Sequence, residues 1–323
     1  MLDDIKITML GTQGAGKTCY MLGMYAAMQT GVRGFSLSAK DMDVDLELTD
    51  LWERLIDVEG EDRWPPPNAA EVKNYAFDFN YGFQPIMGFD WIDYRGRAMS
   101  DRSTEQDVQK LLEHFSNSSC LFLCVSGEYL AKKADQSTVR QIKSNRMNQF
   151  LQKIGEQIKP TPFHPFPVAI VITKYDLCSQ RQKPEIIEDI KELFQPLFTE
   201  KSGWLVMICP VSLGKELAND VDHGIIKPVN VHLPVVFAIY SKFCEYGLEI
   251  KAQKSDTSGE LDRLNQSNFF MKWLNSDEIQ NKESKLQELE SQIREIESNM
   301  TLLAQELQSV SIFRSGKEVK VDV

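Results

Sequence analysis

The chain has 323 residues, 42% of them hydrophobic, which is enough to bury one large core and to carry a further segment. Its net charge of −11, from 47 acidic and 36 basic residues, argues against non-specific binding to nucleic acid or to an anionic membrane. The 6 cysteines are scattered singly and no apolar run approaches the length of a membrane span, so we expect a cytoplasmic protein with reduced thiols and no membrane span.

The first motif is a glycine-rich stretch, residues 11–18, between a strand candidate at 5–10 and a helix candidate at 19–28. Glycines let successive backbone N–H groups turn inward around a phosphate, and the helix start adds its positive dipole end. In this G-x-x-x-x-G-K-[ST] pattern we expect Lys17 to reach the phosphates and Thr18 to ligate Mg²⁺. The expected nucleotide contacts here are Gly11, Gly14, Ala15, Gly16, Lys17, Thr18 and Cys19.

Residues 31–74 are expected to form an insertion that contains an amphipathic helix and, at Trp64-Pro65-Pro66-Pro67, an extended turn. Two alternating segments, 75–81 and 86–92, then predict a pair of hairpin strands. The second strand ends in Asp93-Tyr94-Arg95-Gly96, a D-x-x-G pattern that P-loop folds use to hold Mg²⁺ and to sense the γ-phosphate. Asp93 is therefore a candidate metal ligand and Gly96 a candidate nucleotide contact.

Three continuous apolar runs, 120–125, 168–172 and 204–209, predict strands that are buried on both faces of a parallel sheet. The segments between them, with apolar positions over 139–158 and 186–198, predict amphipathic helices. This alternation is typical of a doubly wound α/β fold, in which the ligand lies at the carboxyl ends of the strands.

The second of these strands leads into Thr173-Lys174-Tyr175-Asp176 and the third into a loop with Ser212 and Leu213. The ordered set of motifs, from residue 4 to about 250, resembles the TRAFAC-like GTPase domain of the P-loop superfamily. The resemblance implies that Asp176 accepts hydrogen bonds from guanine, that Lys174 lies along the base, and that the loop contacts the base edge. It also implies GTP or GDP with Mg²⁺ as cofactors. A helix cap is the alternative role for Thr173 or Asp176, because such residues often begin a helix after a strand.

Departures from the family pattern concern hydrolysis. Ras-like enzymes carry a water-positioning Gln after D-x-x-G, where this chain has Arg97, which could instead stabilise charge on the transferred phosphoryl group. Gln13 resembles the Gln of dynamin-type GTPases and is the preferred residue to orient water. The catalytic candidates are therefore Gln13, Lys17 and Arg97. The alternatives are that Arg97 is a surface residue and Gln13 a loop residue, each without a catalytic role. The switch-I metal ligand is left open between Asn68, Thr49 and another residue, so hydrolysis is expected to be slow or partner-activated.

Three further features are similar to the bacterial double-GTPase type-2 group, whose members are associated with conflict and defence systems. They are the Trp64-Pro65 turn, the stretch Asp93–Gly96 and the later segment 227–234. This resemblance implies protein partners. The alternative to a GTP-hydrolysing switch is a nucleotide-binding scaffold with little or no turnover, which the absent glutamine after D-x-x-G and the open switch-I ligand leave in place.

The C-terminal quarter has a different composition. The GTPase domain is expected to span 1–250, followed by a polar linker, 251–275. From Leu286 onward, apolar residues recur in alternating steps of three and four, which predicts a coiled-coil helix within 276–310. Such a stripe needs a partner, and pairing with another chain is favoured over packing in cis. The tail, 311–323, is either an added strand or a frayed end.

Overall fold

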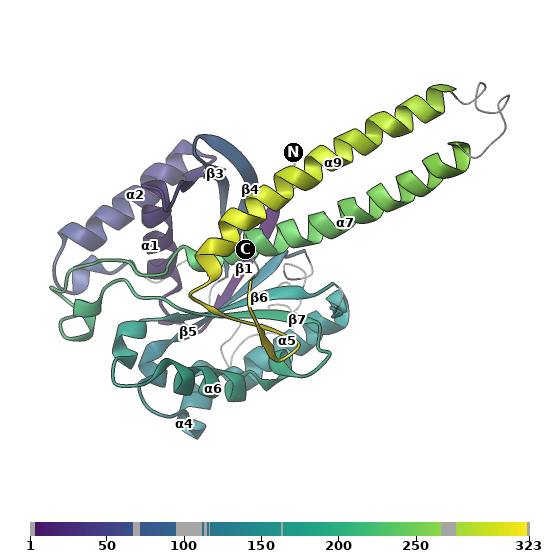
Figure 1. Cartoon of the computed structure of the whole chain (residues 1–323). Coiled ribbons are helices and arrows are strands. Elements are labelled where there is room, and N and C mark those ends of the chain that lie inside the picture. The colour runs from purple at the N-terminus through teal and green to yellow at the C-terminus, as the bar shows by residue number, and fades with distance from the viewer. Residues whose placement is uncertain are drawn as a thin grey trace. The chain divides into compact units, whose positions relative to one another are not determined.

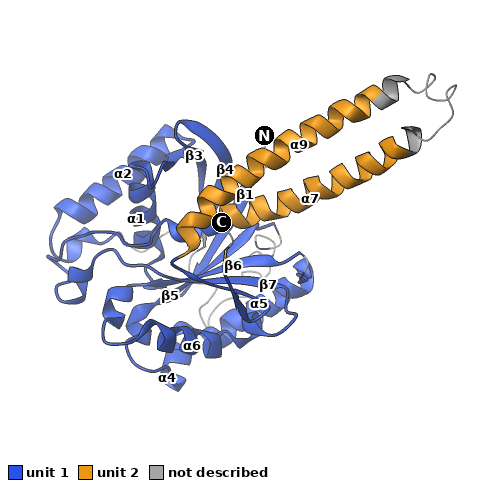
Figure 2. Cartoon of the chain, viewed as in Figure 1, with its two compact units in different colours: residues 1–238, 309–320 blue, residues 239–308, 321–323 orange. Residues whose placement is uncertain are grey.

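The computed structural model describes residues 4–66, 72–94, 112, 115, 117–162, 164–265 and 276–321 (Figure 1). The chain divides into two compact units (Figure 2). Unit 1 comprises Met1–Ala238 and Ser309–Lys320, and unit 2 comprises Ile239–Gln308 and Val321–Val323. The boundary at 238 lies inside a helix, twelve residues before the end predicted for the first domain.

Unit 1 is built on a sheet whose described strands have the order β2-β3-β4-β1-β5-β6-β7-β8-β9. Strands β4, β1, β5, β6 and β7 pair in parallel, and the outer strands pair antiparallel. This confirms the predicted doubly wound, mostly parallel α/β fold. The strands are β1 (Ile5–Gly11), β2 (Phe35–Ala39), β3 (Val72–Tyr81), β4 (Gln84–Tyr94), β5 (Cys120–Ser126), β6 (Phe166–Thr173), β7 (Trp204–Pro210), β8 (Ser311–Arg314) and β9 (Lys317–Val319).

Helices cover both faces of this sheet, which is why β5 and β6 are buried along their whole lengths. Leu121 and Leu123 of β5 pack in one core cluster with Phe150 of α5 (Ser144–Ile158). Phe122, between those leucines, contacts Trp91 on the opposite face. Unit 1 also contains the described helices α1 (Lys17–Gln29), α2 (Met42–Asp57), α4 (Gln136–Ile142) and α6 (Lys183–Leu193), with short 3₁₀ turns between elements.

The structure corrects two helix boundaries within unit 1. The apolar pattern over 139–158 predicted one long helix, but Lys143 adopts a left-handed conformation with φ 59° and separates α4 from α5. A capping box between Asp135 and Thr138 begins α4. The predicted helix at 186–198 is α6 followed by a 3₁₀ turn, Gln195–Phe198. Apolar periodicity continued across both breaks, so it did not reveal them.

Unit 2 corrects the predicted linker. α7 (Leu233–Asn265) continues through the polar stretch 251–265, which was expected to be irregular. It is antiparallel to α9 (Ser276–Leu307), and three ion pairs join them: Lys251–Glu297, Lys254–Glu290 and Lys282–Glu260. The tertiary partner therefore stabilises a helix whose composition alone suggested a loop. Leu289 and Ile296 of the predicted heptad stripe are buried.

The tail that was left undecided forms strands β8 and β9, which extend the sheet beyond β7. Phe313 of β8 belongs to the same core cluster as the central strands. Among the described helices, none is both long and apolar enough to cross a membrane.

Candidate functional site

The loop between β1 and α1 has the backbone that its glycines predict. Gly14 and Gly16 have φ values of 78° and 75°, a left-handed conformation that residues with a Cβ rarely adopt. Gly16 is the N-cap of α1 and makes no side-chain capping hydrogen bond. The first backbone N–H groups of α1 are therefore available to an anionic ligand. A Cβ on Gly11 would lie 2.8 Å from the Cys124 carbonyl oxygen, so the loop also packs directly against β5.

Lys17 folds over this loop. Its Nζ donates hydrogen bonds to the carbonyl oxygens of Gly11, at 3.0 Å, and Thr12, at 3.3 Å. This places a cation beside the backbone N–H groups at the helix start, an arrangement suited to binding a phosphate. Burial raises the pKa of the neighbouring Cys19 thiol to about 11, although Lys174 acts in the opposite direction. Cys19 is therefore a neutral thiol at pH 7 and adds no negative charge beside a phosphate.

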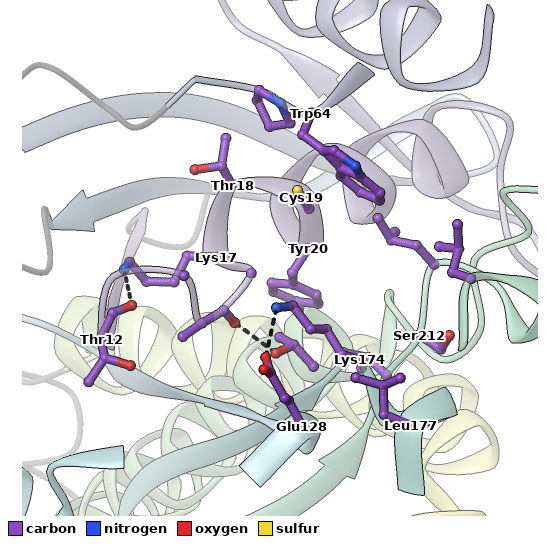
Figure 3. A pocket seen from close by; sticks show the side chains of 18 of the residues that line it. Thr12, Lys17, Thr18, Cys19, Tyr20, Trp64, Glu128, Lys174, Leu177 and Ser212 are labelled. Carbon is purple, nitrogen blue, oxygen red and sulfur yellow. Dashed lines mark hydrogen bonds and ion pairs between the residues drawn. The ribbon is translucent and has the colours of Figure 1, made fainter. Parts of the chain in front are cut away.

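A cavity of about 1110 Å³ opens at this end of the parallel strands, and the phosphate loop forms one part of its wall. Figure 3 shows Lys17, Thr18 and Cys19 on this wall, with Trp64 on the opposite side of the cavity from Glu128 and Lys174. Segments far apart in sequence complete the lining: residues 64–66, Glu128, Gln141, Lys143, residues 173, 174, 176 and 177, residues 211–213, Leu217, Val221 and Val231. A cavity of this size, polar at one end, accommodates a nucleotide.

Asp176 and Ser212 form the polar part of the other end. The Ser212 hydroxyl donates to Asp176 Oδ1 at 2.7 Å and accepts from the Gly214 N–H at 3.0 Å. The serine thereby fixes the direction of the carboxylate, a role of its side chain that the sequence did not predict. A fixed carboxylate in a partly enclosed site selects ligands with hydrogen-bond donors, because an unpaired acceptor is costly there.

Thr173 joins the two ends of the cavity. Its hydroxyl donates to the Ala15 carbonyl oxygen in the phosphate loop, at 2.7 Å, and lies 3.3 Å from the Val125 carbonyl oxygen. The alternative role as a helix cap is not what the structure shows, because the 3₁₀ turn Tyr175–Cys178 has Lys174 as its N-cap and no side-chain capping bond. The T-K-x-D segment therefore cross-links the end of β6 to the phosphate loop and lines the cavity.

Two charged residues of the lining were missed by the sequence analysis. Glu128, directly after β5, lies 3.4 Å from Lys174 Nζ and holds that lysine at the cavity. Lys143 occupies the left-handed break between α4 and α5 and also lines the cavity. The position of Glu128 at the carboxyl end of a buried strand was the available signal, but no motif marked it.

Several predicted residues lie away from the cavity or outside the described residues. Thr49 lies within α2 and does not line the cavity, whereas Gln13 does and is exposed. Asp93 is in β4, where its backbone is in register with Met9 of β1, the strand that leads into the phosphate loop. Asn68, Gly96 and Arg97 are outside the described residues.

Among the described residues, no group of three or more His, Cys, Asp or Glu side chains could hold a metal ion. A Mg²⁺ ion that binds beside a nucleotide needs no such group, because phosphate oxygens and water supply most of its ligands and the protein supplies one or two. Thr18, in the first turn of α1 and on the cavity wall, is such a ligand candidate.

No protein-family model matches the sequence, and no curated protein is similar to it. Many solved structures show limited similarity to the chain, and two of them serve as examples. One is a chain of the signal recognition particle receptor SRb-GTP/SRX complex from Chaetomium thermophilum, with 13% identity, a TM-score of 0.36, and coverage of 66% of this chain and 92% of the other. The second is a putative nucleolar GTP-binding protein 1 from Plasmodium falciparum, with 11% identity, a TM-score of 0.40, and coverage of 80% and 96%.

Both proteins are described as GTP-associated, but similarity at this level carries no conclusion about the activity of this chain. The residues of the cavity itself indicate what it can bind. They provide a cationic, glycine-based anion site at one end, a fixed carboxylate at the other, and a hydroxyl that joins the two.

Proposed function

We propose that this chain is a Mg²⁺-dependent GTP-binding protein that hydrolyses GTP slowly or when activated by a partner. The observation that carries the proposal is the position of Asp176 in the same cavity as the phosphate loop, with its carboxylate fixed by Ser212. Guanine presents two adjacent donors, N1–H and the exocyclic amine, to such a carboxylate. Adenine offers no such pair, so ATP would leave the carboxylate unpaired.

At the phosphate end, Lys17 and the N–H groups at the start of α1 would bind the β- and γ-phosphates. Thr18 and Asp93 are the proposed protein ligands of Mg²⁺, which would neutralise charge on the phosphate oxygens when bound. With only these two protein ligands, phosphate oxygens of the nucleotide would complete the metal site. Mg²⁺ and nucleotide are therefore expected to bind together.

The proposed hydrolysis involves Gln13 and Arg97. Gln13 is exposed on the phosphate loop, where it could orient a water molecule, and Arg97 remains a candidate to stabilise charge on the transferred phosphoryl group. An exposed side chain is poorly pre-organised for catalysis. We therefore expect a low rate of GTP cleavage by the isolated chain, with a partner needed for a high rate.

The test of base selection uses Asp176→Asn. An amide in place of the carboxylate offers an N–H donor to the carbonyl oxygen that xanthine carries where guanine has its amine. The parent chain should bind GTP in preference to ATP and XTP, and Asp176→Asn should bind XTP better than GTP, as measured by equilibrium binding with Mg²⁺. Asp50→Asn, an exposed position on α2 outside the cavity, is the matched control. Equal binding of GTP and ATP by the parent would refute guanine selection.

Coupling to a protein partner through the heptad helix remains part of the proposal, as does a role in a bacterial conflict system. The support for coupling to a protein partner is that α7 buries only part of the apolar stripe of α9. Leu286, Ile293 and Met300 in that stripe keep intermediate exposure. Light scattering of the full chain with GDP and with a non-hydrolysable GTP analogue tests self-association. An identical monomer mass in both states would exclude a second copy as the partner.

A further inference from the structure

The turn that brings Trp64 to the cavity is fixed by a buried arginine. Arg63 ends the 3₁₀ turn Glu61–Arg63 and is 3% exposed. On one side its Nε and Nη2 donate to the Leu55 carbonyl oxygen of α2, at 3.1 and 2.9 Å. On the other side its Nη1 donates to the carbonyl oxygens of Asp222, at 2.8 Å, and Gly224, at 3.2 Å. One guanidinium therefore cross-links the insertion to a loop about 160 residues later.

Backbone carbonyl groups satisfy this buried cation. In the described parts of the chain, no carboxylate forms an ion pair with Arg63. A buried charge without compensating hydrogen bonds is strongly unfavourable, so the arrangement depends on both segments being in place. A backbone hydrogen bond runs parallel to the cross-link, from the Gly60 N–H to the Asp222 carbonyl oxygen at 3.2 Å. Displacing either segment would leave part of the guanidinium unpaired.

The cross-link determines where an apolar part of the cavity wall lies. The guanidinium of Arg63 is 5.5 Å from the centroid of the Trp64 ring, and Trp64 lines the cavity. Val221, at the other end of the cross-link, lines the same cavity. Figure 3 shows the Trp64 ring across the cavity from Lys174. The wall thus consists of one residue from each of the two segments that Arg63 holds together.

We infer that Arg63 is a positioning residue of the nucleotide site: it clamps the 60–64 turn to the 221–224 loop, so that Trp64 and Val221 together form an apolar wall for the nucleoside. This inference rests on the proposed function for the identity of the ligand. It predicts that the two segments lose order together when the clamp is removed. It also predicts that the loss weakens binding of the nucleoside part and leaves the phosphate loop intact.

The first measurement needs no ligand. Arg63→Met keeps most of the side-chain volume but removes every donor, and hydrogen exchange of the full chain should become at least tenfold faster at Gly60 and in 221–224 together. The control is Arg54→Met, an exposed arginine on α2 whose Nε donates to the Asp62 carbonyl oxygen in the same turn. Its exchange should match that of the parent. Faster exchange in only one segment, or in neither, would overturn the clamp.

The second measurement compares two probes, GDP with Mg²⁺ and inorganic pyrophosphate with Mg²⁺. Arg63→Met should weaken GDP binding about tenfold or more and change pyrophosphate binding less than twofold. Parent-like GDP binding, or equal losses for both probes, would overturn the positioning role. Trp64→Ala should also weaken GDP binding while exchange in 221–224 stays at the parent rate, so it tests the wall even where Arg63→Met does not fold. If the parent binds pyrophosphate but not GDP, the proposed function fails, and the exchange result still decides the clamp.

Discussion

The two ends of the cavity are constructed in opposite ways. The phosphate end is one continuous stretch, residues 11–18, whose shape comes from Gly14 and Gly16 and whose cation bonds to its own loop. The end that contains Asp176 is assembled from segments far apart in sequence, which are held by side-chain bonds such as Ser212 to Asp176 and Lys174 to Glu128. Thr173 connects the two ends across 158 positions of sequence.

This difference predicts how each end fails. A local anion loop keeps its backbone when one side chain is lost, so its substitutions should affect binding and leave folding unchanged. An assembled wall depends on polar bonds between elements, so its substitutions should affect stability, base selection or both.

The largest expected effect is on the support of the assembled end. The buried Asp189 carboxylate accepts from Arg181 Nη1, at 2.6 Å, and from the Ala134 N–H, at 2.9 Å. Asp189→Ala leaves the Ala134 N–H without its acceptor and removes the buried counter-charge of Arg181, whose Nη1 keeps the carbonyl oxygens of Leu130 and Lys132. It should lower the free energy of unfolding by about 3 kcal/mol or more, because loss of one partner of a buried ion pair leaves the charge of the other uncompensated. Urea denaturation measures this.

The matched control changes the other carboxylate beside the same arginine. Glu185 is exposed and lies 3.7 Å from Arg181 Nε, so Glu185→Ala should cost less than about 1 kcal/mol. Similar costs for the two variants would mean that Arg181 does not support the fold through Asp189.

At the phosphate end, Lys17→Ala should weaken GTP binding roughly 100-fold, about 2.7 kcal/mol, because charged hydrogen bonds to phosphate are lost. The melting temperature of the ligand-free chain should stay at the parent value, since the hydrogen bonds that are lost lie within the loop itself, to the carbonyl oxygens of Gly11 and Thr12. Titration calorimetry measures the GTP affinity, and a thermal scan measures the melting temperature. Lys133→Ala, an exposed lysine outside the cavity, controls for the change in net charge. A large stability loss would contradict the local construction of this loop.

The same contrast explains what the sequence could reveal. Residues 11–18 match a fixed sequence pattern whose backbone conformation is known, so the loop could be predicted. The apolar runs of β5 and β6 are uninterrupted, so the parallel sheet could be predicted too. Apolar periodicity also identified α2. These features depend on local spacing, which a sequence displays directly.

Features that depend on distant contacts could not be predicted in the same way. Arg63 appears in the sequence as one more charged residue of the insertion, and its burial follows only from carbonyl groups at 222 and 224. The helical state of 251–265 is stabilised by α9, since the run Ser255–Gly259 in the middle of that stretch has low helix propensity. The left-handed Lys143 was hidden for a related reason, because apolar positions continue through it.

A smaller effect is expected where the serine positions the base-binding carboxylate. Ser212→Ala removes the hydroxyl that donates to Asp176 and accepts from Gly214, at a cost of about 1–1.5 kcal/mol, or roughly tenfold in GTP affinity. Pyrophosphate binding should not change. Competition binding of GTP against pyrophosphate gives the ratio, with Ser179→Ala, an exposed serine beyond the T-K-x-D segment, as control. A parallel loss for both ligands would mean that the serine supports the whole cavity and not base selection.

The smallest effect is expected at Tyr20, near the start of α1 and on the cavity lining. Its ring packs 5.9 Å from that of Trp91, while its buried hydroxyl has no hydrogen-bond partner among the described residues, and burial raises its pKa. Tyr20→Phe keeps the ring and removes an unsatisfied polar group, so it should stabilise the chain by up to about 1 kcal/mol, a rise of roughly 2–4 °C in Tm.

Tyr25, five residues further along α1, is the matched control for this change. Its hydroxyl donates to Asp45 and accepts from the Ala39 N–H at 3.3 Å, so Tyr25→Phe should destabilise the chain by about 1–2 kcal/mol. Opposite signs for the two variants would show that α1 is fixed by its rings on the cavity side and by polar bonds on the α2 side. If Tyr20→Phe is instead destabilising and the loss grows when GDP is present, the hydroxyl contacts ligand or ordered water, and the phosphate end then depends on a residue outside its own loop.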